Sequence, residues 1–260
     1  MTARVAWISI APVKGLALVH PDEVLLEPFG VPADRRFHLV GAEGELVNGK
    51  RLGRLVQIEA GLDEEGGRLS LLFPDGKVVA GAIALGEPVT TVFYGRPVEG
   101  RLVLGPFSPA LSAWAGRPLQ LVQPERPCDA HDRGRSRAVS LLSTAALDAL
   151  AAAAGTGERV DGRRFRMLFG VDGIEAHEED GWLDRRVRIG EALVIPRGKV
   201  GRCAVTTHDP DAGEPDLDTL RALKQYRGEV PTVEPLPFGV CGEVAAPGRV
   251  RVGDPVELLL

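Results

Sequence analysis

The chain has few cysteines, and their spacing forms none of the common cysteine motifs. Its 260 residues contain three cysteines, Cys128, Cys203 and Cys241, which lie far apart in the sequence. This spacing argues against a zinc knuckle, a thioredoxin-type motif and a multi-cysteine iron–sulfur cluster. An odd number of cysteines without a signal peptide predicts a reducing, cytoplasmic location.

Long apolar runs and an excess of positive charge are missing as well. No apolar stretch reaches the ~18 residues of a membrane span, so we expect no membrane partner. The net charge is −5, which argues against general nucleic-acid binding. The sequence also lacks the GxGxxG, Walker A, HExxH and GxSxG motifs of nucleotide-binding proteins, metalloproteases and hydrolases.

Glycine and proline are abundant, with 32 and 20 residues, and they divide the chain into short segments. Alternating or β-branched runs bounded by turn signals predict strands at 5–10, 23–26, 36–40, 57–60, 68–73, 89–93, 119–122 and 139–142. Helices are predicted at about 108–115, 143–150 and 217–226, and the tail from 248 predicts a turn-linked strand pair that closes a sheet. This even spacing favours a mainly β (α+β) fold of barrel or sandwich type, with a domain boundary near the polar segment 123–137.

Cys203 lies in the most informative stretch of the chain, residues 200–216. Gly201 and Arg202 precede it, and a turn-rich acidic segment follows it. Neighbouring positive charge favours a thiolate, the form that binds soft transition metals. Two other interpretations stay open: most free cysteines are small core residues, and a nucleophilic Cys203–His208 pair would require the loop to fold back.

Short basic motifs lie at predicted strand ends, beside glycines or turns. They contain Lys14, Arg36, Lys50, Arg164, Arg166 and Arg202. In a barrel such ends gather at one rim, where several cations could clamp a phosphate. Ser143 and Thr144 start a predicted helix whose free amides could bind an anion; simple N-capping is the other interpretation, and both can hold together. One thiol together with a distributed anion clamp suggests an anionic, metal-bearing cofactor.

Several ordered sequence blocks resemble the MOSC family, in which a MOSC domain follows a MOSC N-terminal β-barrel domain. The resemblance is to the amidoxime-reducing members of this family and spans nearly the whole chain. It depends on the blocks at 11–15, 34–40, 140–145, 162–166, 202–211, 223–227, 237–240 and 247–256. It implies an N-terminal β-barrel-like domain at 1–122 and a C-terminal MOSC β-barrel with a few short helices at 123–260.

The resemblance also implies a molybdenum cofactor (molybdopterin) and an oxidoreductase activity. Cys203 would be the metal ligand, and the cofactor-binding residues would be Lys14, Arg36, Ser143, Thr144, Arg164, Arg166 and Arg202. The implied substrates are N-hydroxylated small molecules, namely amidoximes, hydroxylamines and N-hydroxy bases. Because no nucleotide fingerprint is present, a separate electron-donor protein would supply the electrons. Cys128 and Cys241 are expected to be dispensable for metal binding.

The chain departs from the family pattern at two places. Met167-Leu168 stands where the family continues with Pro-Asn, and Lys50 stands where an Arg is common. Two alternative functions stay open: a non-catalytic carrier of molybdenum cofactor or sulfur that uses Cys203, and a barrel that has lost the cofactor and acts as a binding module.

Overall fold

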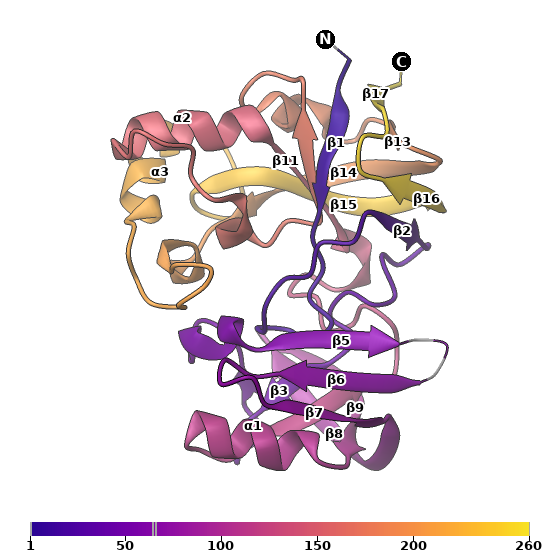
Figure 1. Cartoon of the computed structure of the whole chain (residues 1–260). Helices are drawn as coiled ribbons and strands as arrows, with labels where there is room; N and C mark the ends of the chain where they lie inside the picture. Colours follow the sequence, from indigo (N-terminus) through magenta and orange to yellow (C-terminus); the bar gives the residue numbers. More distant parts are fainter. Residues whose placement is uncertain (1, 64, 66, 260) are drawn as a thin grey trace.

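The computed structural model describes residues 2–63, 65 and 67–259, which form an upper and a lower body (Figure 1). A seven-stranded sheet in the order β1-β12-β11-β15-β14-β13-β17 forms the upper body. Its strands are β1 (Arg4–Ile8), β11 (Val139–Ser143), β12 (Phe169–Asp172), β13 (Val187–Ile189), β14 (Ala192–Gly201), β15 (Pro237–Ala246) and β17 (Val256–Leu258).

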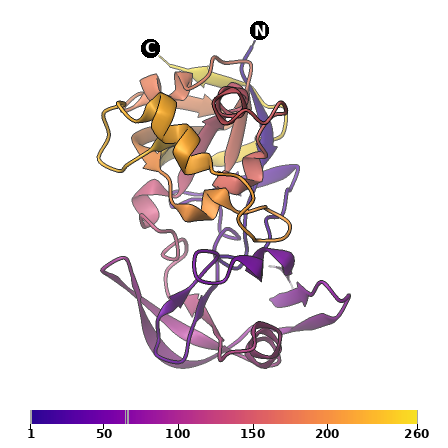
Figure 2. The same ribbon diagram turned by 90° about the vertical axis from the view of Figure 1, so that its left-hand side faces the viewer.

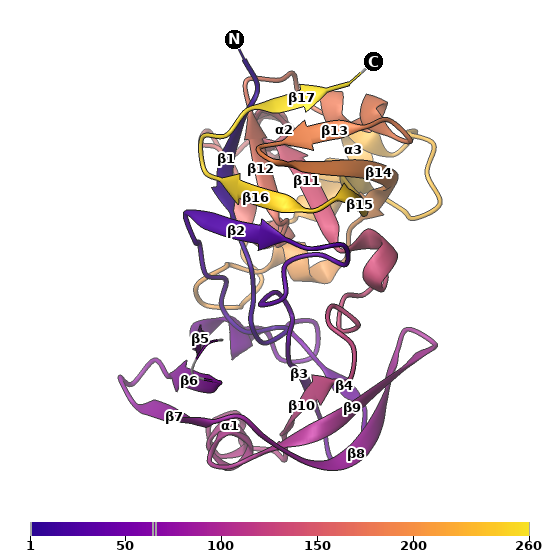
Figure 3. The same ribbon diagram turned by 90° about the vertical axis from the view of Figure 1, so that its right-hand side faces the viewer.

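The upper sheet curls until its two edges meet. The backbone N–H of Val5 donates to the carbonyl of Asp254, and that of Val256 donates to the carbonyl of Ala3, both at 2.9 Å. Figure 3 shows β1 and β17 beside each other, close to both chain ends. This sheet is therefore a nearly closed barrel, and the prediction of a mainly β fold is confirmed.

The lower body contains most of the N-terminal half. A five-stranded sheet has the order β4-β3-β10-β9-β8, and a three-stranded sheet has the order β5-β6-β7. The strands are β3 (His38–Val40), β4 (Leu46–Val47), β5 (Glu59–Asp63), β6 (Arg68–Leu72), β7 (Val78–Ala82), β8 (Ala84–Phe93), β9 (Arg96–Leu104) and β10 (Gln120–Pro124). A bridge from Glu45, beside β4, to Val92 in β8 joins the two edges of the larger sheet into a barrel-like form.

Three α-helices occur in the described part of the chain: α1 (Phe107–Ala115), α2 (Thr144–Ala154) and α3 (Thr219–Arg227). The helix α1 buries Phe107 and Leu111 in the lower core and ends at Gly116, whose φ of 67° suits a left-handed C-cap. The helices α2 and α3 cover one side of the upper sheet, as Figure 2 shows. None of the described helices is long and apolar enough to cross a membrane.

Short 3-10 helices form the remaining regular structure: η1 (Gly53–Gln57), η2 (Arg135–Arg137), η3 (Gly162–Phe165), η4 (Glu178–Trp182) and η5 (Ala204–Thr207). Three of them, η1, η3 and η5, contain or adjoin residues that line the space between the two bodies.

The domain boundary predicted between residues 122 and 123 does not coincide with the division of the structure into two bodies. The strands β1 and β2 (Glu23–Leu26) come from the first 26 residues, yet they pair with β12 and β16 (Gly248–Arg251) of the C-terminal half. Val5, Ile8 and Leu26 are buried in the same core as the strands of that half. Because this apolar surface completes the upper core, the N-terminal segment belongs to the upper body.

The predicted strand pair in the tail is wrong in its pairing. The two strands exist as β16 and β17, but β16 pairs with β2 and β17 pairs with β13. The turn at Gly253 therefore directs the two strands to different neighbours, and β17 completes the barrel at its edge.

Candidate functional site

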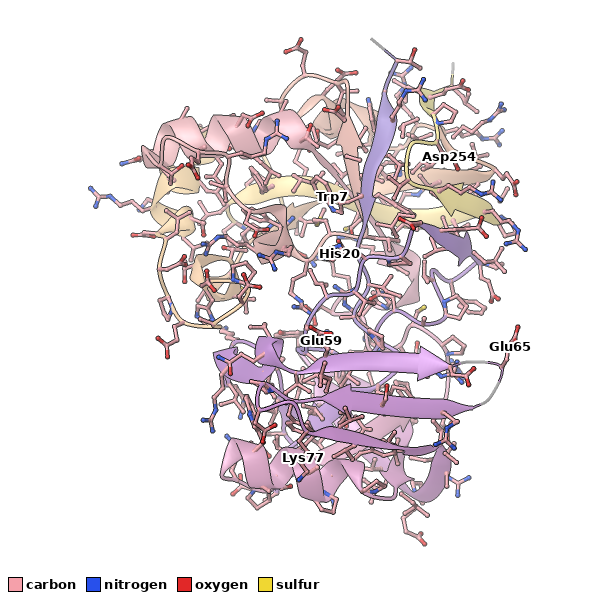
Figure 4. All side chains as sticks on the ribbon, viewed as in Figure 1. Trp7, His20, Glu59, Glu65, Lys77 and Asp254 are labelled. Carbon is pink, nitrogen blue, oxygen red and sulfur yellow. The ribbon has the colours of Figure 1, made fainter. Side chains whose placement is uncertain are left out.

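A cleft of about 510 Å³ lies between the two bodies. A second hollow of about 440 Å³ adjoins it, and the two share five lining residues: Gly49, Val56, Arg164, Arg166 and Val205. Glu59 lines the second hollow and lies at the junction of the two bodies in Figure 4. Both halves of the chain therefore contribute to one continuous depression.

Cys203 is an exposed free thiol that lines this cleft. It follows β14 directly and caps η5, with an extended backbone at φ −130° and ψ 178°. Its carbonyl accepts hydrogen bonds from the backbone N–H of Thr206 at 3.1 Å and from Thr206 Oγ1 at 3.0 Å. The backbone of Cys203 is therefore fixed while its side chain faces open space, so the thiol is not a core residue.

Arg202, next to the thiol, is occupied by the protein itself. Its guanidinium donates to the carbonyls of Phe238 and Phe165, both at 3.0 Å, and lies over the Phe165 ring at 5.2 Å. Burial, followed by the charge of Arg133, lowers its pKa to about 9. Arg202 lines the cleft as predicted, but its hydrogen bonds hold β14 against β15 and η3, so its main effect is to position Cys203.

The cleft is strongly electropositive despite the net negative charge of the chain. Two carboxylates line it, those of Asp132 and Glu234. Against them stand eight cationic side chains: Lys14, Arg35, Lys50, Arg133, Arg137, Arg164, Arg166 and Arg202. A concave site with such a surplus attracts anions and raises their local concentration.

Lys14 lies at the floor of the cleft. Its ammonium donates to the carbonyl of Ala130 at 2.8 Å and forms an ion pair with Asp132 at 2.5 Å. Burial lowers the pKa of Lys14, while the charge of Asp132 opposes this shift. Lys14 is thus a desolvated cation at the position where the sequence predicted a cofactor contact.

Arg35 lines the cleft, whereas the predicted residue Arg36 is not among its lining residues. Arg35 has a left-handed backbone with φ 52°, which turns its side chain toward Asp34 and the carbonyl of Arg166. This turn directs Arg35 into the cleft, and the adjacent Arg36 does not line it. The predicted motif therefore reaches the cleft through Arg35 and not through Arg36.

Arg164 and Arg166 both line the cleft, as predicted. Arg164 pairs with Asp216 at 2.5 Å, and its buried Nε has no hydrogen-bond partner among the described residues. Arg166 donates to the carbonyl of Leu16 at 2.7 Å, and burial, followed by the charge of Arg35, lowers its pKa to about 10. Desolvated guanidinium groups with incomplete partners favour a bound anion.

Ser143 and Thr144 are not among the residues that line the cleft. Ser143 ends β11 and Thr144 begins α2, whereas Ser140, near the other end of the same strand, lines the site. The backbone N–H of Ser143 donates to Glu179 at 3.2 Å, and Thr144 Oγ1 donates to Asp172 at 2.7 Å. Carboxylates of the chain thus occupy this helix start, because the strand carries it away from the basic rim.

The remaining predictions concern sulfur and histidine. No hydrogen bond between described residues joins Cys203 to His208, which lines the adjoining hollow instead. Cys241 is buried and lines the same cleft, and burial raises the pKa of its thiol. Among the described residues, no group of three or more His, Cys, Asp or Glu side chains could hold a metal ion.

The family relationship follows from the two halves of the chain. Residues 128–257 match the MOSC domain, and residues 2–93 match the MOSC N-terminal beta barrel domain. The chain belongs to the MOSC family. This assignment confirms the resemblance, and it agrees with a cleft formed between two β-barrel bodies.

Several relatives of this MOSC protein have names that refer to molybdenum or to amidoximes. The mitochondrial amidoxime-reducing component 1 of Homo sapiens is 27% identical, with 98% of this chain and 82% of the relative covered. The protein of the same name from Danio rerio is 28% identical over 88% of this chain and 75% of its own length. A molybdenum cofactor sulfurase of Oryza sativa subsp. japonica is 24% identical, but only 31% of it is covered, against 86% of this chain.

Among solved structures, the YUAD protein of Bacillus subtilis is similar, with a TM-score of 0.46 and 13% identity over 99% of this chain and 96% of that protein.

Sequence reasoning missed several side chains of the site. Arg133 and Arg137 lie in the segment 123–137, which was interpreted as loop or linker, and Glu234 lies in a segment without any predicted element or motif. Tyr94 occupies a two-residue turn of unusual composition. A tyrosine at a position that favours Asn or Asp was the one signal in the sequence that could have drawn attention to it.

Proposed function

We propose that this MOSC protein is a molybdenum-cofactor-dependent oxidoreductase that reduces N-hydroxylated compounds. The observation that carries this proposal is the exposed, rigidly held thiol of Cys203 in a cleft lined by a large surplus of cations. A thiolate is a soft ligand for a transition metal, and arginine forks bind phosphate in two-point contacts. The names of the relatives supply the reaction class.

The residues of the cleft fit an anionic, metal-bearing pterin. Cys203 would ligate the metal, and Lys14, Arg164 and Arg166 would bind the phosphate and the pterin. The buried Nε of Arg164 is a donor without an acceptor in the described part of the chain, and the lowered pKa values of Arg166 and Lys14 indicate cations with incomplete charge compensation. A bound anion would compensate these charges.

The reduction of an amidoxime consumes two electrons and two protons, and it releases the oxygen as water. The cofactor, when bound, supplies the two-electron centre for this chemistry. The chain itself would contribute a fixed thiol, an oriented set of cations and a cleft wide enough for a small substrate. We propose a separate protein as the electron donor, because the sequence has no nucleotide fingerprint.

A direct test uses protein produced in a host that makes the molybdenum cofactor. We expect molybdenum close to one equivalent per chain, and reduction of benzamidoxime to benzamidine with reduced methyl viologen as the electron donor. Elemental analysis and chromatography of the product measure both. A molybdenum-free protein that carries a persulfide on Cys203 would contradict the proposal and favour a sulfur carrier, whereas loaded but inactive protein would favour a cofactor carrier.

Arg166 provides a second prediction, about cofactor retention. Replacing it by Gln removes a desolvated charge, whereas Arg166→Lys retains the charge but loses the planar fork. We expect molybdenum content to fall roughly tenfold in Arg166→Gln and by less in Arg166→Lys, as for the loss of one charge-assisted contact. Arg188→Gln is the matched control, because the Arg188 side chain is 54% exposed and its ion pair with Glu257 is long, at 3.9 Å. Unchanged molybdenum in Arg166→Gln would refute the anion clamp.

A further inference from the structure

A two-residue turn places one aromatic side chain at the mouth of the cleft. Phe93 of β8 pairs with Arg96 of β9, so Tyr94 and Gly95 alone connect the strands. Their φ values are 49° and 86°, as in the type I′ turns that favour Asn-Gly or Asp-Gly. A left-handed backbone is unfavourable for a residue as bulky as tyrosine. Figure 3 shows the β8–β9 ribbon curving from the lower body toward the upper one.

The base of this turn is held firmly. Phe93 is 1% exposed, and the His38 ring meets its edge with the ring centroids 4.9 Å apart. Arg96 donates to the carbonyls of Asp129 and His131 at 2.7 and 2.8 Å. These contacts fix the turn against the segment that connects the two bodies, so the surrounding structure enforces the unfavourable backbone of the tip.

Packing does not explain the tyrosine, because its side chain is 65% exposed. Tyr94 lines the cleft together with Cys203, and its hydroxyl accepts a hydrogen bond from Asn48 Nδ2 at 3.4 Å. Desolvation, followed by the charges of Asp132 and Cys203, raises the pKa of the phenol. The ring therefore stays neutral and faces the same space as the thiol. An unfavourable backbone that carries a largely exposed side chain at a cleft indicates a functional role for that side chain.

We propose that Tyr94 is a specificity-determining residue whose ring forms one wall of a substrate subsite for planar, conjugated N-hydroxylated compounds. Aromatic amidoximes and N-hydroxylated bases would stack on this ring, whereas small aliphatic analogues would gain nothing from it. The inference rests on the proposed function and narrows its substrate class. The rigid turn keeps the ring in place before the substrate arrives, which reduces the entropy cost of binding.

Binding of two matched ligands tests this inference separately from catalysis. Benzamidoxime and acetamidoxime share the amidoxime group, and only the first has a ring. Isothermal titration calorimetry on loaded, oxidised protein without reductant gives the dissociation constants. We expect Tyr94→Ala to weaken benzamidoxime binding roughly tenfold, as for the loss of one stacking contact, and to change acetamidoxime binding less than twofold. Tyr94→Phe should bind both ligands as the native protein does.

Tyr94→Asn separates recognition from turn stability. Asparagine suits the left-handed position, so this variant should melt at a higher temperature than the native protein and still lose benzamidoxime selectivity. A variant that is both more stable and less selective is not expected from a purely structural tyrosine. Retained selectivity in Tyr94→Asn would overturn the inference.

Other outcomes of the binding measurements also test the role of Tyr94. Equal affinity of the native protein for the two amidoximes, or no measurable benzamidoxime binding, would overturn the stacking wall. A loss of molybdenum and pterin in Tyr94→Ala, with both ligands weakened equally, would show that the ring contacts the cofactor instead. Selective, Tyr94-dependent binding by a protein that reduces no N-hydroxylated compound would refute the reductase proposal and leave this inference standing.

Discussion

Replacing Cys203 by Ala should abolish the reduction of N-hydroxylated substrates and leave the fold intact. Loss of a hydrogen-bond partner that orients a metal ligand typically costs roughly 10- to 100-fold in metal affinity or activity. Loss of the ligand itself should therefore cost more than about 100-fold. The side chain is exposed, and its backbone is held by Thr206 and by the hydrogen bonds of Arg202. The free energy of unfolding should therefore change by less than about 0.5 kcal/mol.

Cys241→Ala is the matched control for this prediction, because Cys241 lines the same cleft but is 3% exposed. It should lower the stability by about 1 kcal/mol, as expected for a small buried side chain, and retain its molybdenum. Cys203→Ser adds an intermediate step, since a hydroxyl is a much harder ligand than a thiolate. Activity, metal content and melting temperature should be measured on all three variants. Activity that survives in Cys203→Ala would rule out ligation by this thiol.

The sequence was most informative where local chemistry decides the structure. The strand at 23–26 was predicted with its observed bounds. The helix α1 was also predicted, because Gly116 ends it and the apolar pattern marks its buried face; it begins one residue before its predicted start at 108. The Cys203 segment stands out in the sequence because it combines a glycine, an arginine and a thiol next to a turn, and the structure places this thiol in the cleft.

The pairing of strands that are distant in the sequence could not be predicted from local patterns. The strands β14 and β15 have 10 residues each and pair along their length, but bulges shift their register at several places and weaken the alternation that reveals a strand. The position of β1 in the C-terminal barrel depends on contacts between residues more than 160 apart, such as Arg4 and Asp172. No local pattern encodes such a pairing.

In the candidate site, too, local sequence patterns were informative, whereas positions set by the tertiary structure were not predicted. Lys14, Arg164 and Arg166 line the cleft together, as expected if the strand ends of a barrel gather at one rim. Arg36 was chosen in place of Arg35, because the left-handed backbone of Arg35 reverses the expected alternation. Ser143 was assigned to the rim because a helix start attracts anions, but it ends β11, and Ser140 near the other end of that strand lines the site.

Asp34→Ala should cause the largest loss of stability of any variant considered. Asp34 is 1% exposed and accepts hydrogen bonds from the backbone N–H of Ala11 at 2.8 Å, from His131 Nε2 at 3.0 Å and from Arg35. It joins the segment after β1 to the linker between the bodies and orients one of the cleft arginines. Removing one partner of a buried ion pair costs about 3–5 kcal/mol, because the other charge remains desolvated. The melting temperature should fall by roughly 10 °C.

The exposed pair of Asp148 and Arg159 provides the control, because its side chains are 51% and 53% exposed. Asp148→Ala should cost less than about 1 kcal/mol, as surface pairs usually do. Asp34→Asn should fall between the two, since the amide retains the shape and one acceptor but loses the charge. Equal melting temperatures for Asp34→Ala and Asp148→Ala would contradict the assignment of Asp34 as a buried anchor.

The pH dependence of stability gives an independent check on Asp34. Burial alone would raise the pKa of this carboxyl, but the charge of Arg35 and the hydrogen bonds from His131 and Ala11 lower it well below its ordinary value. A folded-state pKa below the unfolded one means that the carboxylate contributes stability fully above pH ~4, and that this contribution is lost as the pH falls further. The stability difference between the native protein and Asp34→Asn should therefore be largest near neutral pH and shrink in acid. Chemical denaturation between pH 7 and pH 3 measures this difference, and a gap that widens in acid would show that Asp34 is not the ionised partner of Arg35.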